Sequence, residues 1–125
     1  MADPAIPIEV ASLLSRSVRS VWALELLLFL RQHSADDWTS DQLSAQLRSS
    51  RVVVNNVTPI LVRDGLVEEL DNGRYRYRAQ GELDRSVAEL ERLYKERPVA
   101  IVRAIVLARD TQLQDFADAF KFRKD

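Results

Sequence analysis

The sequence predicts a mainly helical fold with one two-stranded ribbon and additional helices at both ends. Apolar residues recur at helical spacing over most of the 125 residues, and one Asp71-Asn72-Gly73 turn joins two short strand-like runs. A hydrophobic content of 46% with 30% charged residues is typical of a globular chain. We expect one globular unit in which residues 1–18 form a lead-in and short helix, 19–78 the central domain, and 79–125 helices for packing or dimerisation.

Two helices are predicted in the first third of the chain. Pro7 suits the first turn of a short helix, in which Leu13 and Leu14 follow Val10 at the helical spacings of three and four residues. From about Arg19 to Gln32 the residues are apolar almost all round. This pattern indicates a central helix that is covered on most of its faces.

A short helix and a longer one should follow. Thr39 or Ser40 is a suitable N-cap for the short helix, which carries Leu43, Ala45 and Leu47. The longer helix spans roughly Ser50 to Asp64 and is closed by Gly65, which suits a left-handed position. Pro59 removes a backbone donor inside it, so the helix is either kinked or restarts with Pro59 in its first turn.

The next segment has the pattern of a β-hairpin. Leu66, Val67 and Leu70 begin a strand, and Asp71-Asn72-Gly73 is typical of a type I′ turn. The return strand from Arg74 to Arg78 alternates strictly between arginine and tyrosine. We therefore expect Arg74, Arg76 and Arg78 on one face of the ribbon, and Tyr75 and Tyr77 packed inward on the other.

The last third contains three apolar helical patterns. They are the heptad-like seam Leu83, Val87, Leu90 and Tyr94, the run Val99–Leu107 after Pro98, and the face Leu113, Phe116, Ala117 and Phe120 that precedes Lys121, Arg123 and Lys124. So much apolar surface favours a homodimer built on these helices. In the competing interpretation, the same helices fold back on the central helix of one chain.

Composition excludes several classes of protein. There is no cysteine, which removes disulfides, thiolate zinc sites and cysteine nucleophiles. The single histidine, His33, lies where the central helix should end, no serine has a Gly-x-Ser-x-Gly context, and the three glycines are dispersed. We expect no enzyme activity, cofactor or metal site.

Neither a membrane span nor a secretory signal is evident. The longest apolar stretch, Val21–Leu30, carries Glu25 and is about ten residues long, whereas a membrane span needs roughly twenty. The start of the chain has no basic region followed by an apolar one. A cytoplasmic protein without membrane association is therefore expected.

Residues 19–78 follow the order helix, short helix, helix, glycine, strand, turn, strand. With Gly65-Leu66-Val67 after the third helix and Asn72-Gly73 in the hairpin, this segment resembles the winged helix-turn-helix domains of bacterial transcriptional regulators. The resemblance covers about half of the chain. It implies a supporting helix over Thr39–Leu47, a recognition helix over roughly Ser50–Asp64 and a wing over Leu66–Arg78.

A winged helix of this kind implies a DNA-binding transcriptional regulator with double-stranded DNA as partner. Residues 48–78 hold six arginines against four acidic residues, although the formal net charge of the chain is −1. The candidate base readers are Arg51, Asn55 and Asn56, and the candidate phosphate contacts are Arg48, Arg74, Arg76 and Arg78. The alternative is a protein–protein interaction module, because the third helix also carries Val52, Val53 and Pro59.

Overall fold

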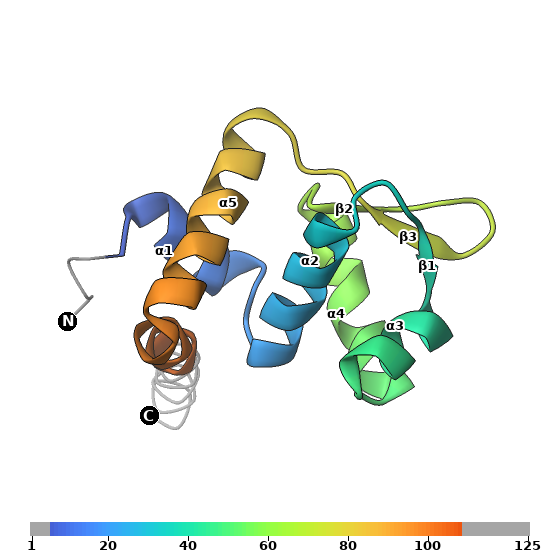
Figure 1. Cartoon of the computed structure of the whole chain (residues 1–125), viewed down its shortest axis with the longest axis horizontal. Coiled ribbons are helices and arrows are strands. Elements are labelled where there is room, and N and C mark those ends of the chain that lie inside the picture. Colours follow the sequence, from blue (N-terminus) through green and yellow to red (C-terminus); the bar gives the residue numbers. More distant parts are fainter. Residues whose placement is uncertain (1–5, 109–125) are drawn as a thin grey trace, which may run out of the picture.

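In the computed structural model, which describes residues 6–108, the chain is mainly helical with a small three-stranded antiparallel sheet (Figure 1). The elements are α1 (Ile8–Arg16), α2 (Val21–Gln32), β1 (Trp38–Thr39), α3 (Ser40–Leu47), α4 (Arg51–Arg63), β2 (Val67–Glu69), β3 (Arg74–Tyr77) and α5 (Gly81–Glu96). Residues 98–108 are also helical. The predicted face from Leu113 to Phe120 lies outside the described residues.

Helix α2 occupies the centre of the molecule, as its apolar sequence predicts. The Ser20 hydroxyl accepts a hydrogen bond from the Ala23 amide at 3.1 Å, so the helix begins two residues later than expected. Six of its twelve side chains are buried. The prediction of a helix covered on most faces is confirmed.

Side-chain caps define the starts of α3 and α4. Thr39 and Gln42 form a capping box at α3, and the Ser50 hydroxyl caps α4. Helix α4 runs unbroken through Pro59, so the predicted restart at that residue is wrong. Pro59 is exposed, and the carbonyl that it leaves without a helical donor belongs to the exposed residue Asn55.

The sheet has one strand more than the two-stranded ribbon predicted. Its strand order is β1-β3-β2, with Trp38 opposite Tyr75 and Val67 opposite Tyr77. A two-residue strand such as β1 is too short to produce a recognisable alternation in the sequence. The expected inward packing of Tyr75 and Tyr77 is confirmed, because both contact the hydrophobic core.

The hairpin turn differs from the predicted type I′. The Leu70 amide donates to the Arg74 carbonyl at 2.7 Å, and the Gly73 amide donates to the Leu70 carbonyl at 2.9 Å. Only Gly73, with φ at +73°, is left-handed in the turn, whereas type I′ needs positive φ at both central residues. The turn is therefore a three-residue loop closed by a left-handed glycine, and it places Glu68 opposite Arg76.

The helices after the sheet pack within one chain. Helix α5 lies against α1, and Val87 and Leu90 are fully buried. Ile101 and Ile105, in the helix that begins at residue 98, join the same core. The predicted seam of α5 thus faces the interior of the chain, as the intramolecular interpretation requires.

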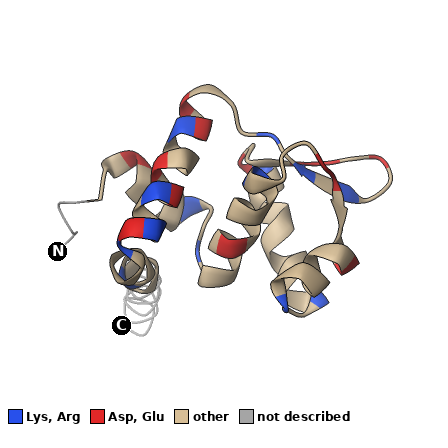
Figure 2. Cartoon of the chain, viewed as in Figure 1, with Lys and Arg blue, Asp and Glu red and all other residues tan. Residues whose placement is uncertain are grey.

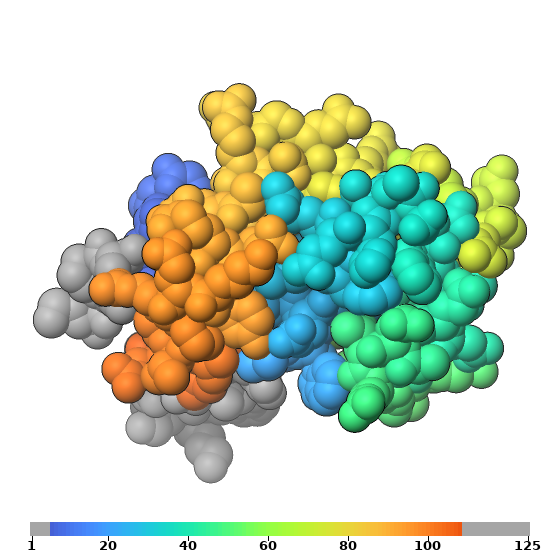
Figure 3. Space-filling model, viewed as in Figure 1, coloured from blue at the N-terminus to red at the C-terminus, as the bar shows by residue number. Residues whose placement is uncertain are grey.

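The terminal helices and the sheet occupy opposite ends of the molecule. Figures 1 and 3 show α1 and α5 at one end, α3 and the hairpin at the other, and α2 between them. Within residues 6–108, no helix has the length and apolar character that crossing a membrane requires.

Candidate nucleic-acid interface

The outward face of α4 carries two asparagines that are available for recognition. Asn55 and Asn56 are exposed, and neither side chain has a hydrogen-bond partner among residues 6–108. Val52 and Pro59 share the exposed surface, and Val52 is 68% exposed. Between its terminal arginines, Arg51 and Arg63, α4 contains no charged residue, so its ribbon is tan over most of its length in Figure 2.

Two arginines flank the turn between α3 and α4. Arg48 ends α3 in a left-handed conformation with φ at +53°, and its exposed side chain has no partner within the described range. Arg51 pairs with Asp41 at 2.9 Å, and the two side chains are 67% and 71% exposed. An ion pair this exposed contributes little to the stability of the fold. The Arg51 guanidinium can therefore leave Asp41 and bind a phosphate with only a small loss of free energy.

Arg74 connects the hairpin to the segment before α3. Its Nε donates to Asp37 Oδ1 at 2.5 Å, and its Nη2 donates to the Asp37 carbonyl at 3.2 Å and to Gln42 Oε1 at 3.3 Å. Only 29% of its side chain is exposed. The structure therefore gives Arg74 internal partners at the position where the sequence suggested a phosphate contact.

We expect Arg74→Ala to reduce the free energy of unfolding by about 1–2 kcal/mol, because Asp37 loses a charged hydrogen-bond donor. Urea denaturation measures this change. Arg78→Ala is the matched control on the same segment and should change stability by less than about 0.5 kcal/mol, since its side chain is exposed. Equal stabilities for the two variants would show that Arg74 has no structural role.

The other two hairpin arginines differ in their surroundings. Arg76 pairs across the strands with Glu68 at 2.6 Å, whereas Arg78 is exposed and its side chain has no ion-pair partner among the described residues. Glu68, Glu69 and Asp71 line a shallow depression together with Arg78. The hairpin therefore carries acidic and basic groups side by side (Figure 2).

Asp37, Gln42 and Glu68 are the partners that the sequence prediction missed. The pairing of Asp37 with Arg74 depends on strand β1, which follows Asp37 in the chain and was not predicted. The pairing of Glu68 with Arg76 could be predicted only from the register of the hairpin, and the three-residue loop sets that register.

A half-buried hydrogen bond fixes the end of β3 against α5. The Tyr77 hydroxyl donates to Asp84 Oδ1 at 2.6 Å, and Arg31 of α2 contacts the same carboxylate at 3.4 Å. Burial, together with this hydrogen bond, raises the pKa of Tyr77 far above its usual value. The tyrosine therefore remains a neutral donor in ordinary buffers and holds the hairpin in one orientation relative to α5.

The part of the chain that the structure describes contains no group of three or more His, Asp or Glu side chains arranged to hold a metal ion. His33 is the C-cap of α2, and its ring lies 4.5 Å from that of Phe29 and 5.6 Å from that of Trp38. This placement agrees with the predicted helix-terminating role. Comparisons with protein-family models, curated proteins and solved structures find no match to this chain.

Proposed function

We propose that residues 19–78 form a winged helix and that the chain is a DNA-binding transcriptional regulator. The observation that carries the proposal is α4, which presents Asn55 and Asn56 to solvent and has Arg48 and Arg51 at its N-terminal end. The hairpin of β2 and β3 lies beside this helix. The order of helices and strands supports the same proposal, because it is the order found in winged helices.

In this proposal, α4 enters the major groove and the asparagines read base edges. An asparagine side chain binds adenine in a bidentate manner, because its amide nitrogen donates to N7 and its oxygen accepts from the N6 amino group; no valine or proline side chain can do this. Arg48 contacts a phosphate near the N-terminus of α4, and Arg78 contacts one from the hairpin. Arg51, which the sequence suggested as a base reader, is reassigned to a phosphate contact, because it is the first residue of α4 and its exposed partner Asp41 is readily exchanged. Arg74 and Arg76 act mainly by positioning the hairpin, since both have carboxylate partners.

Replacing Asn55 and Asn56 with alanine should alter sequence preference while leaving binding to random DNA nearly unchanged. Selection from a randomised duplex pool, followed by sequencing, measures the preference of each protein. Gln46→Ala on the exposed face of α3 is the control and should retain the original preference. Identical selected sequences for the double variant and the unaltered chain would remove the asparagines from base readout.

The second candidate function is a protein-interaction module. Exposed apolar side chains favour it: Val52 on α4, and Trp22, which is 43% exposed near the start of α2. The pairing of hairpin arginines with carboxylates favours it as well, because it lowers the positive charge that DNA binding needs. On this reading, the chain has no measurable affinity for DNA.

A homodimer is proposed as the form that binds two half-sites. Since α5 is packed inside the chain, the face left for a second copy lies on the helix of residues 98–108, where Val99 and Val106 are exposed and seven residues apart. Sedimentation equilibrium at micromolar concentration should give twice the chain mass of 14.3 kDa. The double variant Val99→Asp/Val106→Asp should be monomeric and folded, and a monomeric unaltered chain would reject the dimer.

A further inference from the structure

The outward side of α4 carries an uncharged stripe of exposed residues, here called the outer stripe. Its members are Val52, Asn55, Asn56 and Pro59, which follow the spacing i, i+3, i+4 and i+7 and therefore lie along one face of the helix. The outer stripe offers two primary amides and two apolar groups. It contains neither a cation nor a carboxylate.

The packing of the fold does not account for Val52. The Ser50 hydroxyl accepts a hydrogen bond from the Val53 amide at 3.2 Å, which places Val52 in the first turn of α4. Val54 is buried in the core and Val53 is half-buried, whereas 68% of Val52 is exposed. A β-branched residue also has a lower helix propensity than alanine, so Val52 does not favour the helix locally. Its methyl groups are open to contact with a partner.

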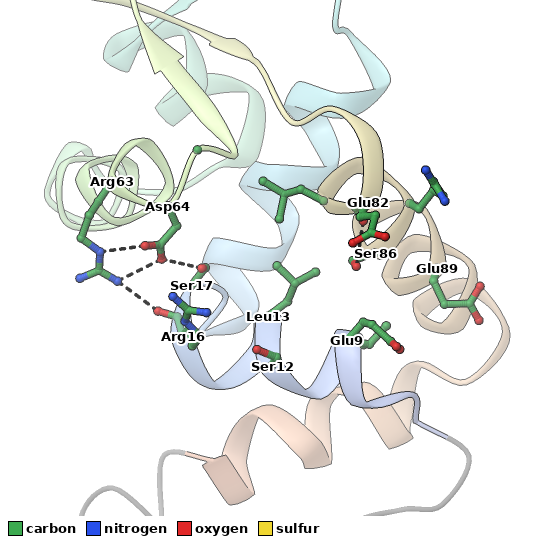
Figure 4. A pocket seen from close by; sticks show the side chains of 14 residues that line it. Glu9, Ser12, Leu13, Arg16, Ser17, Arg63, Asp64, Glu82, Ser86 and Glu89 are labelled. Atoms are coloured by element: carbon green, nitrogen blue, oxygen red, sulfur yellow. Dashed lines mark hydrogen bonds and ion pairs between the residues drawn. The ribbon is translucent and has the colours of Figure 1, made fainter.

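The arginine at the C-terminal end of α4 has internal partners. The Arg63 guanidinium donates to the two Asp64 carboxylate oxygens at 3.0 Å each and to the Arg16 carbonyl at 3.4 Å (Figure 4). The Ser17 hydroxyl donates to the same carboxylate at 2.6 Å, and the hydrogen bond from Arg63 lowers the pKa of Asp64. These bonds connect the end of α4 to α1 and engage the guanidinium that could otherwise bind guanine.

The chemistry of the outer stripe matches the major-groove edge of an A·T base pair. Adenine presents the N7 acceptor and the N6 amino donor, which one asparagine amide satisfies together, and thymine presents a C5 methyl group that binds apolar side chains. Guanine is bound mainly by arginine or lysine, and cytosine by carboxylates, and the outer stripe has none of these.

The spacing along α4 agrees with such a site. Val52 precedes Asn55 and Asn56 by three and four residues, a separation of about 5–6 Å between Cβ atoms. Successive base pairs are about 3.4 Å apart along the duplex. Val52 and an asparagine can therefore reach the same base pair or neighbouring ones.

We propose that the outer stripe recognises A·T base pairs, and that Val52 determines this specificity by packing against the C5 methyl group of thymine. The inference rests on the proposed DNA-binding function and names the bases that α4 contacts. One of the two asparagines binds adenine, and Val52 covers the methyl group of a thymine in the same or the next base pair. The position of Val52 suits this role, because the N-terminal residues of a recognition helix contact base edges.

Selection from a randomised duplex pool is the first arm of the test, and we expect A·T pairs to be enriched at neighbouring positions. Fluorescence anisotropy on the unselected pool measures binding that does not depend on sequence. The most enriched duplex is then made with uracil in place of thymine, which removes the C5 methyl group and keeps every hydrogen-bonding group. Uracil should weaken binding of the unaltered chain about fourfold for each methyl group that is contacted.

Val52→Ala is the variant that isolates the methyl contact. It should bind the thymine duplex as weakly as the unaltered chain binds the uracil duplex, and it should not distinguish the two duplexes. Ile8→Ala is the matched control, because it removes an exposed β-branched side chain from α1 and should retain the preference for thymine. Circular dichroism confirms that both variants are folded.

Failure of this inference is distinguishable from failure of the proposed function. If the chain binds neither the unselected pool nor any selected duplex, both are overturned. Binding to the pool without enrichment, enrichment of G·C pairs, or equal affinities for thymine and uracil would overturn the recognition of A·T pairs and leave DNA binding in place. A Val52→Ala variant that still prefers thymine would overturn the role of Val52 and leave its side chain to a protein partner.

Discussion

Alanine replacement of Arg48 and Arg51 is expected to weaken binding to random duplex DNA by roughly 10- to 100-fold. Both guanidiniums lie at the N-terminal end of α4, and neither has a buried partner to lose. Each phosphate contact releases counterions, so the double variant should also flatten the plot of log K against log salt by about two. Fluorescence anisotropy between about 50 and 200 mM salt measures both effects.

Arg97→Ala/Arg103→Ala is the matched control, because it removes two exposed arginines from the other end of the molecule. It should leave affinity within about twofold of the unaltered chain, since the terminal helices lie at the opposite end of the molecule from α3 (Figure 1) and salt screens charges that are far from the bound phosphates. If both double variants lose the same affinity, binding follows total charge, and the assignment of phosphate contacts to the α3–α4 turn is wrong.

The second large effect concerns stability, and Leu90→Ala is expected to lower the free energy of unfolding by about 2–5 kcal/mol. Leu90 is 0% exposed in a single chain, so its truncation leaves a cavity between α5 and the rest of the core. Urea denaturation followed by circular dichroism gives the change. The acidic substitution Leu90→Glu would unfold the chain, and for this reason the test of dimerisation is placed on Val99 and Val106.

Ile8→Ala is the control for this stability change, because Ile8 begins α1 with an exposed side chain. Its effect should stay within about 0.5 kcal/mol. A Leu90→Ala change as small as that of Ile8→Ala would mean that α5 does not pack in the core of the chain, and that its seam faces another surface.

The order of the helices followed from short-range chemistry that the sequence displays. Apolar spacing located α1, α2 and α5, and the cap residue Thr39 marked the start of α3. Strand β1 was missed because two residues carry no periodicity, and it forms only through pairing with β3. The predicted turn type was wrong because the sequence Asp71-Asn72-Gly73 fits both the two-residue loop of a type I′ turn and a three-residue loop that ends in a left-handed glycine.

The sequence predicted which residue types the candidate site contains, but it did not predict which of these side chains have internal partners and which are free to bind DNA. Exposure of Asn55 and Asn56 followed from the apolar stripe of α4, which the sequence contains. The partners of Arg74 and Arg76 depend on strand register and on a contact between segments more than thirty residues apart. Such pairings are set by tertiary packing, and local patterns do not specify them.

Backbone chemical-shift mapping tests most directly whether α4 binds DNA. The ¹⁵N-labelled full chain is titrated with a random-sequence duplex at about 50 mM salt, where phosphate contacts are strongest. We predict the largest shift changes at Arg48, Arg51 and Asn55, smaller ones at Arg78, and none along the face of α5. An unchanged spectrum, or changes confined to α1 and α5, would contradict the proposal that this chain binds DNA through α4.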